Sequence, residues 1–312
     1  MRTWMLAISI ILGAMFYFVF VWFSDLAPYE EPVLMCVKTI QPVFIFAMLF
    51  ITFCKVDPRE LQLCRWHVSN LLFQTLTFLV LACPIIVWPD ATREVKPIFE
   101  AAMLCLICPT ATAAAVVTGK LGGNMASLTT YTILINLVVA IIVPAAVPFV
   151  MGDAALGFWT SFALIISKVF PLLICPFLLA VILRRFAPKV VHAVTSIRDL
   201  AFYLWAISLS LAIMVSVKSL YESDAAGFVL GGIALASFVT CYLQFYLGRR
   251  FGRRHDSTIT AGQALGQKNT VFLIWCAYTF FDPVSSLAGG FYSIWHNLWN
   301  SYQLAQKAKA ES

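Results

Sequence analysis

Residues 257–281 read "STITAGQALGQKNTVFLIWCAYTFF" and form a long apolar run with polar residues inside it. Its length and apolar content are those of a helix that crosses a membrane, which needs about 20 residues. A polar cluster of Gln263, Gln267, Lys268 and Asn269 lies near its middle, beside two glycines. A break in a helix within hydrocarbon exposes backbone groups that are costly unless they find partners. The stretch therefore predicts a membrane helix that is broken at a functional position.

A second interrupted stretch, "AAMLCLICPTATAAAVVTGKLGGN", occupies residues 101–124. Pro109 cannot continue the helical hydrogen-bond ladder, and the small residues that follow it include Thr110, Thr112, Ala114 and Ala115. Paired interruptions at matching positions of two halves are the best sequence pointer to the binding site of a secondary transporter. We therefore expect the residues of both interruptions to form one substrate or ion site.

The two stretches are the fourth and ninth of ten apolar runs. The runs lie near residues 4–24, 33–54, 67–88, 97–120, 124–150, 157–184, 198–219, 226–248, 257–281 and 283–306. Hydrophobic residues make up 61% of the 312 positions and charged residues only 12%, against about 25% charged in soluble domains. We predict an all-α polytopic membrane protein. The short loops leave no room for a soluble catalytic domain or a nucleic-acid-binding domain.

The lysines and arginines test the ten-span assignment. Of 21, 15 fall on the side of the first residue, 3 fall on the other side, and 3 lie within spans. Basic loops mark the cytoplasmic side of a membrane protein. We therefore expect both termini to be cytoplasmic, in a cell (inner) membrane, and the net charge of +6 needs no nucleic-acid partner.

The loop between Gly152 and Gly157 divides the chain into halves of five spans each, residues 1–151 and 157–312. Because five is odd, the two halves enter the membrane from opposite sides. That arrangement is typical of the inverted-topology repeats of secondary transporters. The prediction is thus ten helices in two inverted five-helix repeats, with the fourth and ninth broken.

Polar residues inside the predicted spans are candidates for the site. A lysine at the depth of Lys268 costs about 2.5–3.5 kcal/mol on insertion scales, so it should face a backbone carbonyl, a glutamine or a bound anion. Gln263 and Gln267 are one helical turn apart and share a face. Lys168, deep in the sixth run, and His296 and Asn297 in the tenth run can line a cavity. A simple interhelical hydrogen bond is the alternative for His296 and Asn297.

The sequence contains no catalytic motif. No nucleophile elbow, metalloprotease helix or phosphate loop is present, and the nine cysteines lack metal-ligand spacing. We therefore expect no enzyme activity, no metal centre and no cofactor.

Three segments together resemble the bile acid:sodium symporter family. "GGFYSIWHNLWNSYQLAQKAKA" (289–310) is similar to that family's last span, which has an F-S-x-W-H-N pattern. "ICPTATAAAVVTGKLGGNMA" (107–126) is similar to its fourth span, and "TAGQALGQKNT" (260–270) to its ninth span, which reads E-x-G-x-Q-N. The resemblance implies a panel domain and a core domain in which broken helices 4 and 9 cross. It also implies sodium-coupled import of bile acids or other amphipathic organic anions.

The chain departs from the family pattern at the ion-binding positions. Ala114 and Ala115 stand where the family has Ser-Asn, and Gln263 stands where it has Glu. Lys268 replaces the next Asn, and two unit charges 4 Å apart repel by about 4 kcal/mol at an effective dielectric constant of 20. We therefore expect a degraded sodium site in which the Lys268 ammonium takes the place of sodium, either as a fixed charge or as a carrier of a coupled proton.

The expected function is secondary transport of a small organic anion across the lipid bilayer by alternating access, without the family's usual sodium coupling. Two alternatives stay open: a non-transporting binding or sensor protein on the same fold, and a cation/proton exchanger. Exchangers usually carry acidic residues where their broken helices cross, and the two stretches quoted above have none there. The sequence selects neither a particular substrate nor an oligomeric state.

Overall fold

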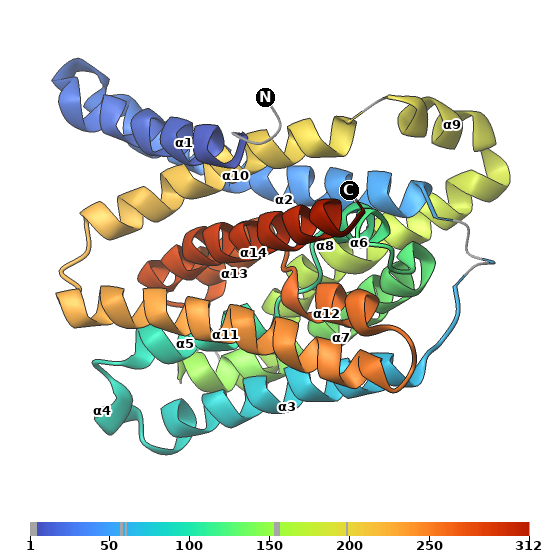
Figure 1. Cartoon of the computed structure of the whole chain (residues 1–312). Helices are drawn as coiled ribbons and strands as arrows, with labels where there is room; N and C mark the ends of the chain where they lie inside the picture. Colours follow the sequence, from blue (N-terminus) through green and yellow to red (C-terminus); the bar gives the residue numbers. More distant parts are fainter. Residues whose placement is uncertain (1–4, 57–58, 60, 153–156, 198, 312) are drawn as a thin grey trace.

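The computed structural model of the chain describes residues 5–56, 59, 61–152, 157–197 and 199–311. The loop predicted to divide the halves falls largely on residues 153–156, outside the described residues, and so do positions 1–4 and 312. The described part is helical and contains no strand (Figure 1). Its elements are α1 (Met5–Trp22), η2 (Ser24–Tyr29), α2 (Glu30–Cys54), α3 (Arg65–Val87), α4 (Pro89–Thr92), α5 (Lys96–Ile107), α6 (Ala114–Lys120), α7 (Met125–Met151), α8 (Phe158–Phe186), α9 (Pro188–Ser196), α10 (Leu200–Tyr221), α11 (Gly227–Arg253), α12 (Thr258–Gly266), α13 (Thr270–Phe280), η4 (Pro283–Ser286) and α14 (Leu287–Glu311).

Seven helical segments are long and apolar enough to cross a membrane, among the residues that the structure describes. They are Met5–Trp22, Ser24–Cys54, Arg65–Val87, Met125–Met151, Phe158–Phe186, Leu200–Tyr221 and Gly227–Arg253. These helices indicate a multi-pass membrane protein, as expected from the composition.

The other three predicted spans do not form continuous apolar helices. The fourth run is divided into α5 and α6, and the ninth run is divided into α12 and α13. The tenth run forms α14, which has 25 residues, but its histidine, asparagine, glutamine and lysine side chains lower its hydropathy below that of a spanning helix. Helix length and composition alone therefore give seven crossings instead of ten.

The long helix α3 buries polar side chains and exposes apolar ones. Its side chains Asn70 and Gln74 are fully buried, whereas Leu72, Leu76 and Leu79 are exposed. Exposed leucines on one face are costly in water and favourable in hydrocarbon. This orientation fits a helix whose outer face contacts lipid.

The helices pack in two groups. In the first group, α1 packs against α10, and α2 packs against both α8 and α10. The second group contains α3, α5, α6, α7 and α11 to α14, with α11 in contact with α5, α12 and α14. Figure 1 shows α1, α2 and α10 along one side of the molecule and α3 along the opposite side. The two groups meet where α7 contacts α8 and where α10 contacts α13.

Candidate functional site

The first break is produced by Pro109. Helix α5 ends at Ile107, and the next residue, Cys108, has an extended backbone with φ −49° and ψ 137°. A residue before proline is biased away from helical geometry, and proline itself has no N–H to donate. The chain resumes as helix α6 at Ala114. The interruption predicted in residues 101–124 is therefore present.

The second break lies between α12 and α13. Helix α12 ends at Gly266, and Gln267 leaves the helix with φ −88° and ψ 116°. A Cβ atom at Gly266 would lie 2.4 Å from the Phe245 ring on α11, so the close packing requires glycine. Asn269 then caps α13, because its side chain accepts a hydrogen bond from the Phe272 N–H at 3.2 Å. The predicted interruption in residues 257–281 is present as well.

The two breaks bind each other through their backbones. Thr110 and Lys268 form an isolated antiparallel β-bridge. The Ala111 N–H donates to Gln267 O at 3.0 Å, and the Asn269 N–H donates to Pro109 O at 2.8 Å. We call residues 108–113 and 267–269 the crossover. Backbone groups released by one break are thus satisfied by the other, as they must be away from water.

The side chains of the two bridge residues each cap the opposite half-helix. Lys268 Nζ donates to Leu106 O, at the end of α5, at 3.0 Å. Thr110 Oγ1 donates to Ala264 O, near the end of α12, at 2.7 Å. The last carbonyls of a helix carry partial negative charge and have no intrahelical partner. The Lys268 side chain, only 1% exposed, therefore finds the carbonyl partner that was one of its expected options.

Two glutamine–tyrosine pairs support the crossover, and the sequence reasoning missed all four residues. In α3, Gln74 Nε2 donates to Leu106 O at 2.6 Å, and its Oε1 accepts from the Tyr131 hydroxyl of α7. In α11, Gln244 Nε2 donates to Cys105 O and to the Tyr292 hydroxyl of α14, both at 3.1 Å. Tyr292 in turn donates to Gly266 O at 2.9 Å. The sequence signal that could have identified the glutamines was the presence of one glutamine inside each of the third and eighth apolar runs.

The remaining predicted residues of the two breaks lie in or beside the crossover. Gln263 and Gln267 are buried, and the Gln267 amide donates to the Gln263 Oε1 atom. Ala114 is buried at the start of α6, whereas Thr112 and Ala115 are partly exposed. The side chains of the two alanines offer no ligand atom to a cation, and the Gln263 Oε1 atom already accepts a hydrogen bond.

Two amide N–H donors at or beside the crossover are left unused. Gln263 Nε2 and Asn269 Nδ2 are buried and have no hydrogen-bond partner among the described residues. The Asn269 Oδ1 atom is occupied by the α13 cap. Two free N–H donors can bind an anion or another hydrogen-bond acceptor.

The predicted cavity residues of α14 and α8 separate in the structure. His296 is buried beside Tyr292, with ring centroids 5.6 Å apart, and its Nδ1 atom has no partner among the described residues. Asn297 is partly exposed and donates to Ser293 O at 2.7 Å, within its own helix. Lys168 is exposed and lies over the Phe280 ring at the far end of α13, 5.8 Å from its centroid. Lys168 therefore does not join the crossover.

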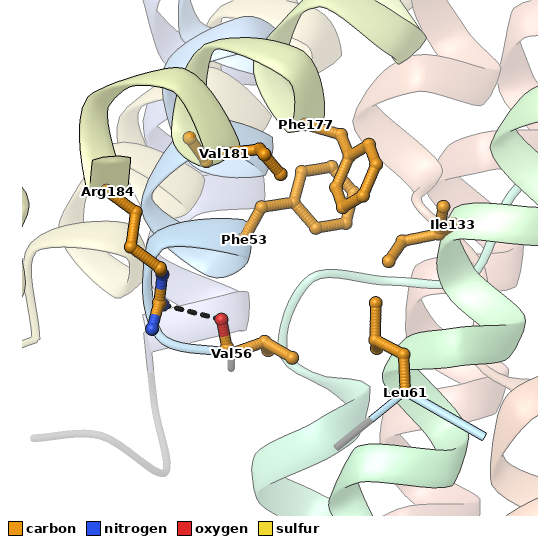
Figure 2. Close-up of a pocket in the computed structure, with 8 residues that line it drawn as sticks. Phe53, Val56, Leu61, Ile133, Phe177, Val181 and Arg184 are labelled. Atoms are coloured by element: carbon orange, nitrogen blue, oxygen red, sulfur yellow. Dashed lines mark hydrogen bonds between the residues drawn. The ribbon is translucent and has the colours of Figure 1, made fainter. Parts of the chain in front are cut away.

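A small apolar cavity of about 10 Å³ lies between the two groups of helices (Figure 2). Phe53 of α2 and Phe177 of α8 face Ile133 of α7 across it. Arg184 closes one end and donates to Cys54 O at 2.8 Å and to Val56 O at 2.5 Å. The cavity has room for about one water molecule, so the helix groups are tightly packed at this end.

No group of three or more histidine, cysteine, aspartate or glutamate residues could bind a metal ion in the part of the chain that the structure describes. A scan against protein-family models matches none of them, and a search of curated proteins finds no match.

Proposed function

We propose that this chain is a secondary transporter built as two inverted five-helix repeats, with ten crossings that include the divided helices α5/α6 and α12/α13. The observation that carries the proposal is the reciprocal capping at the Thr110–Lys268 bridge. Two broken segments at matching positions, each pairing with the other, are the arrangement used by many transporters at the membrane midplane. The glutamine–tyrosine pairs add support, since Gln74 and Gln244 occupy the third run of each half, and Tyr131 and Tyr292 occupy the fifth.

Transport would occur by motion of one helix group against the other. The first group, α1, α2, α8 and α10, would act as the panel, and the second group, with the crossover, as the core. The packing of α1 on α10 resembles the packing of α8 on α2, as expected if α1 corresponds to α8 and α2 to α10. Rigid-body rocking about a central site provides alternating access. The termini would lie in the cytoplasm of a bacterial cell, on the basic side.

The substrate class we infer is an amphipathic organic anion, such as a bile-acid-like carboxylate or sulfonate. The unused donors Gln263 Nε2 and Asn269 Nδ2 can bind the oxygens of an anionic group. Lys268 directly precedes Asn269 and lies at the same crossover, and Gln263 is five residues before Lys268 in the sequence. In a site of low dielectric constant, the Lys268 charge attracts an anion more strongly than it would in water.

We infer that Lys268 replaces a coupling cation. The ammonium group sits at the end of α5, where a bound cation would also be attracted by the exposed carbonyls. A sodium ion at the same place would be repelled by it. Transport would then be independent of sodium, and it would be driven either by exchange or by protons.

Uptake of a labelled bile acid into proteoliposomes tests this function. We expect uptake to persist when sodium is replaced by potassium, and the effect of an imposed pH gradient separates proton coupling from exchange. Sodium-driven uptake would contradict the role given to Lys268. Saturable binding without uptake would contradict transport and favour the alternative of a sensor on the same fold.

A further inference from the structure

A cleft of about 430 Å³ lies where α2 and α8 end and α9 begins. It lies beside the small cavity of Figure 2, and Arg184 borders both. Three lining side chains carry N–H donors: Lys55, Arg184 and His192. The full lining is Cys54, Lys55, Arg184, Pro188, Val191, His192 and Thr195.

The ionisable nitrogen-containing side chains of this cleft are all basic. No carboxylate is among its lining residues. Arg184 is held by the carbonyls of Cys54 and Val56, which fixes the position of its guanidinium group and also neutralises the negative end of α2. Lys55 and His192 are exposed, and no ion pair involves either side chain within the described part of the chain. Their N–H groups are available to a ligand.

Apolar side chains are exposed in and next to α9, which forms one wall of the cleft. Phe186 is 81% exposed, Val190 is 45% exposed and Ile197 is 52% exposed, and all three lie in or next to α9. Exposed apolar side chains beside basic side chains are typical of a helix at a membrane interface. The same end of the bundle carries the arginines at the end of α11, as expected for the cytoplasmic face, where anionic lipids attract basic segments.

We propose that this cleft binds the phosphate headgroup of an anionic membrane lipid. Lys55 and His192 would donate to the phosphate oxygens, and Arg184 would contribute a fixed positive charge. The lipid's acyl chains would cover the apolar side chains of α9. A bound headgroup would thereby link the ends of α2, α8 and α9. The exposed Phe186 favours a lipid over free phosphate, because a soluble anion would leave that side chain in water.

Lipid retention by the full-length chain in detergent tests the proposal. Native mass spectrometry would compare short-chain phosphatidylglycerol with phosphatidylcholine, and a parallel titration would use glycerol phosphate. We expect selective retention of phosphatidylglycerol, weakened about tenfold in a Lys55→Ala/His192→Ala variant, as expected for loss of basic side chains near anionic lipid. Arg184 is left unchanged because it supports the end of α2.

An Arg253→Ala/Arg254→Ala variant is the matched control, since it removes two exposed basic residues from the same end of the bundle. It should retain phosphatidylglycerol as the unmodified chain does. Equal weakening in both double variants would overturn the proposal, because attraction would then reflect general surface charge. If glycerol phosphate bound as tightly as the lipid, the proposal of a lipid ligand would be wrong, because a soluble phosphate would then be sufficient for binding.

Discussion

In the first break a threonine hydroxyl caps the opposite half-helix, whereas in the second break a lysine ammonium does so. Both residues belong to the same β-bridge. Their positions are therefore equivalent, and the main difference between the two side chains is the charge of the lysine. Thr110 demonstrates that a neutral donor is sufficient to satisfy a carbonyl there. Leu106 O also accepts a second hydrogen bond, from Gln74.

The Lys268 charge is therefore not needed for backbone hydrogen bonding at the crossover. A lysine at membrane depth costs about 2.5–3.5 kcal/mol on insertion scales, and a serine or threonine would avoid that cost. In the proposed transport function, that charge has an ionic role at the crossover.

The largest effect is expected from Lys268→Met. Loss of a charge-assisted hydrogen bond costs about 1.5–3 kcal/mol, and we expect uptake of labelled bile acid by proteoliposomes to fall by at least about tenfold. Lys168→Met makes the same chemical change at an exposed position away from the crossover and should leave uptake near normal. Equal uptake by Lys268→Met and the unmodified chain at every pH and sodium concentration would refute the ionic role.

Gly266→Ala should destabilise the second break. The added Cβ would lie 2.4 Å from the Phe245 ring, and overpacking of this kind costs about 1–3 kcal/mol. Unfolding in detergent, followed by circular dichroism, measures the change. Gly231→Ala is the control: no atom lies within 4 Å of its added Cβ, and alanine in a helix is favoured by about 0.5–1 kcal/mol. A Gly266→Ala chain as stable as the control would show that the break is loosely packed.

Tyr292→Phe should destabilise the protein more than Tyr131→Phe. The Tyr292 hydroxyl takes part in two hydrogen bonds, with Gly266 O and Gln244, whereas the Tyr131 hydroxyl bonds to Gln74 alone among the described residues. Each net hydrogen bond contributes about 0.5–1.5 kcal/mol, and an unsatisfied buried partner adds to the loss. Parallel thermal unfolding of the two variants gives the order. The reverse order would mean that the first break depends more on its tyrosine.

The smallest effect is expected from Thr110→Val, which keeps the shape of the side chain and removes its donor to Ala264 O. We expect a stability loss of about 1 kcal/mol and little change in uptake, and Thr110→Ser should restore stability. If Thr110→Val reduced uptake as strongly as Lys268→Met, hydrogen bonding at the crossover would matter and the charge would not.

Local sequence signals predicted the class of protein and the two breaks. The apolar runs reflect transfer of side chains into hydrocarbon, which each segment expresses without reference to its neighbours. Pro109 interrupts its own helix because it lacks an N–H group, so the first break could be placed within a few residues. The glycines beside Gln263 gave a weaker signal, yet α12 ends at one of them.

Partners far apart in the chain could not be predicted from such signals. The hydrogen bonds of Gln74 and Gln244 join different helices, and their choice depends on which helices pack together. Lys168 and Lys268 are both lysines deep in apolar runs, but tertiary packing buries only Lys268. The polar face of α14 is also explained only by its place among other helices.

The sequence by itself therefore determined that the helices of this protein are suited to a lipid bilayer. It also determined where two of them break, because hydrophobicity and proline geometry act locally. Only the tertiary structure decided that the two breaks cap each other, that one lysine lies buried at the bridge, and that basic side chains meet in a cleft beside α9. Those arrangements join residues more than 100 positions apart, and they form because buried backbone groups must find partners wherever packing provides them.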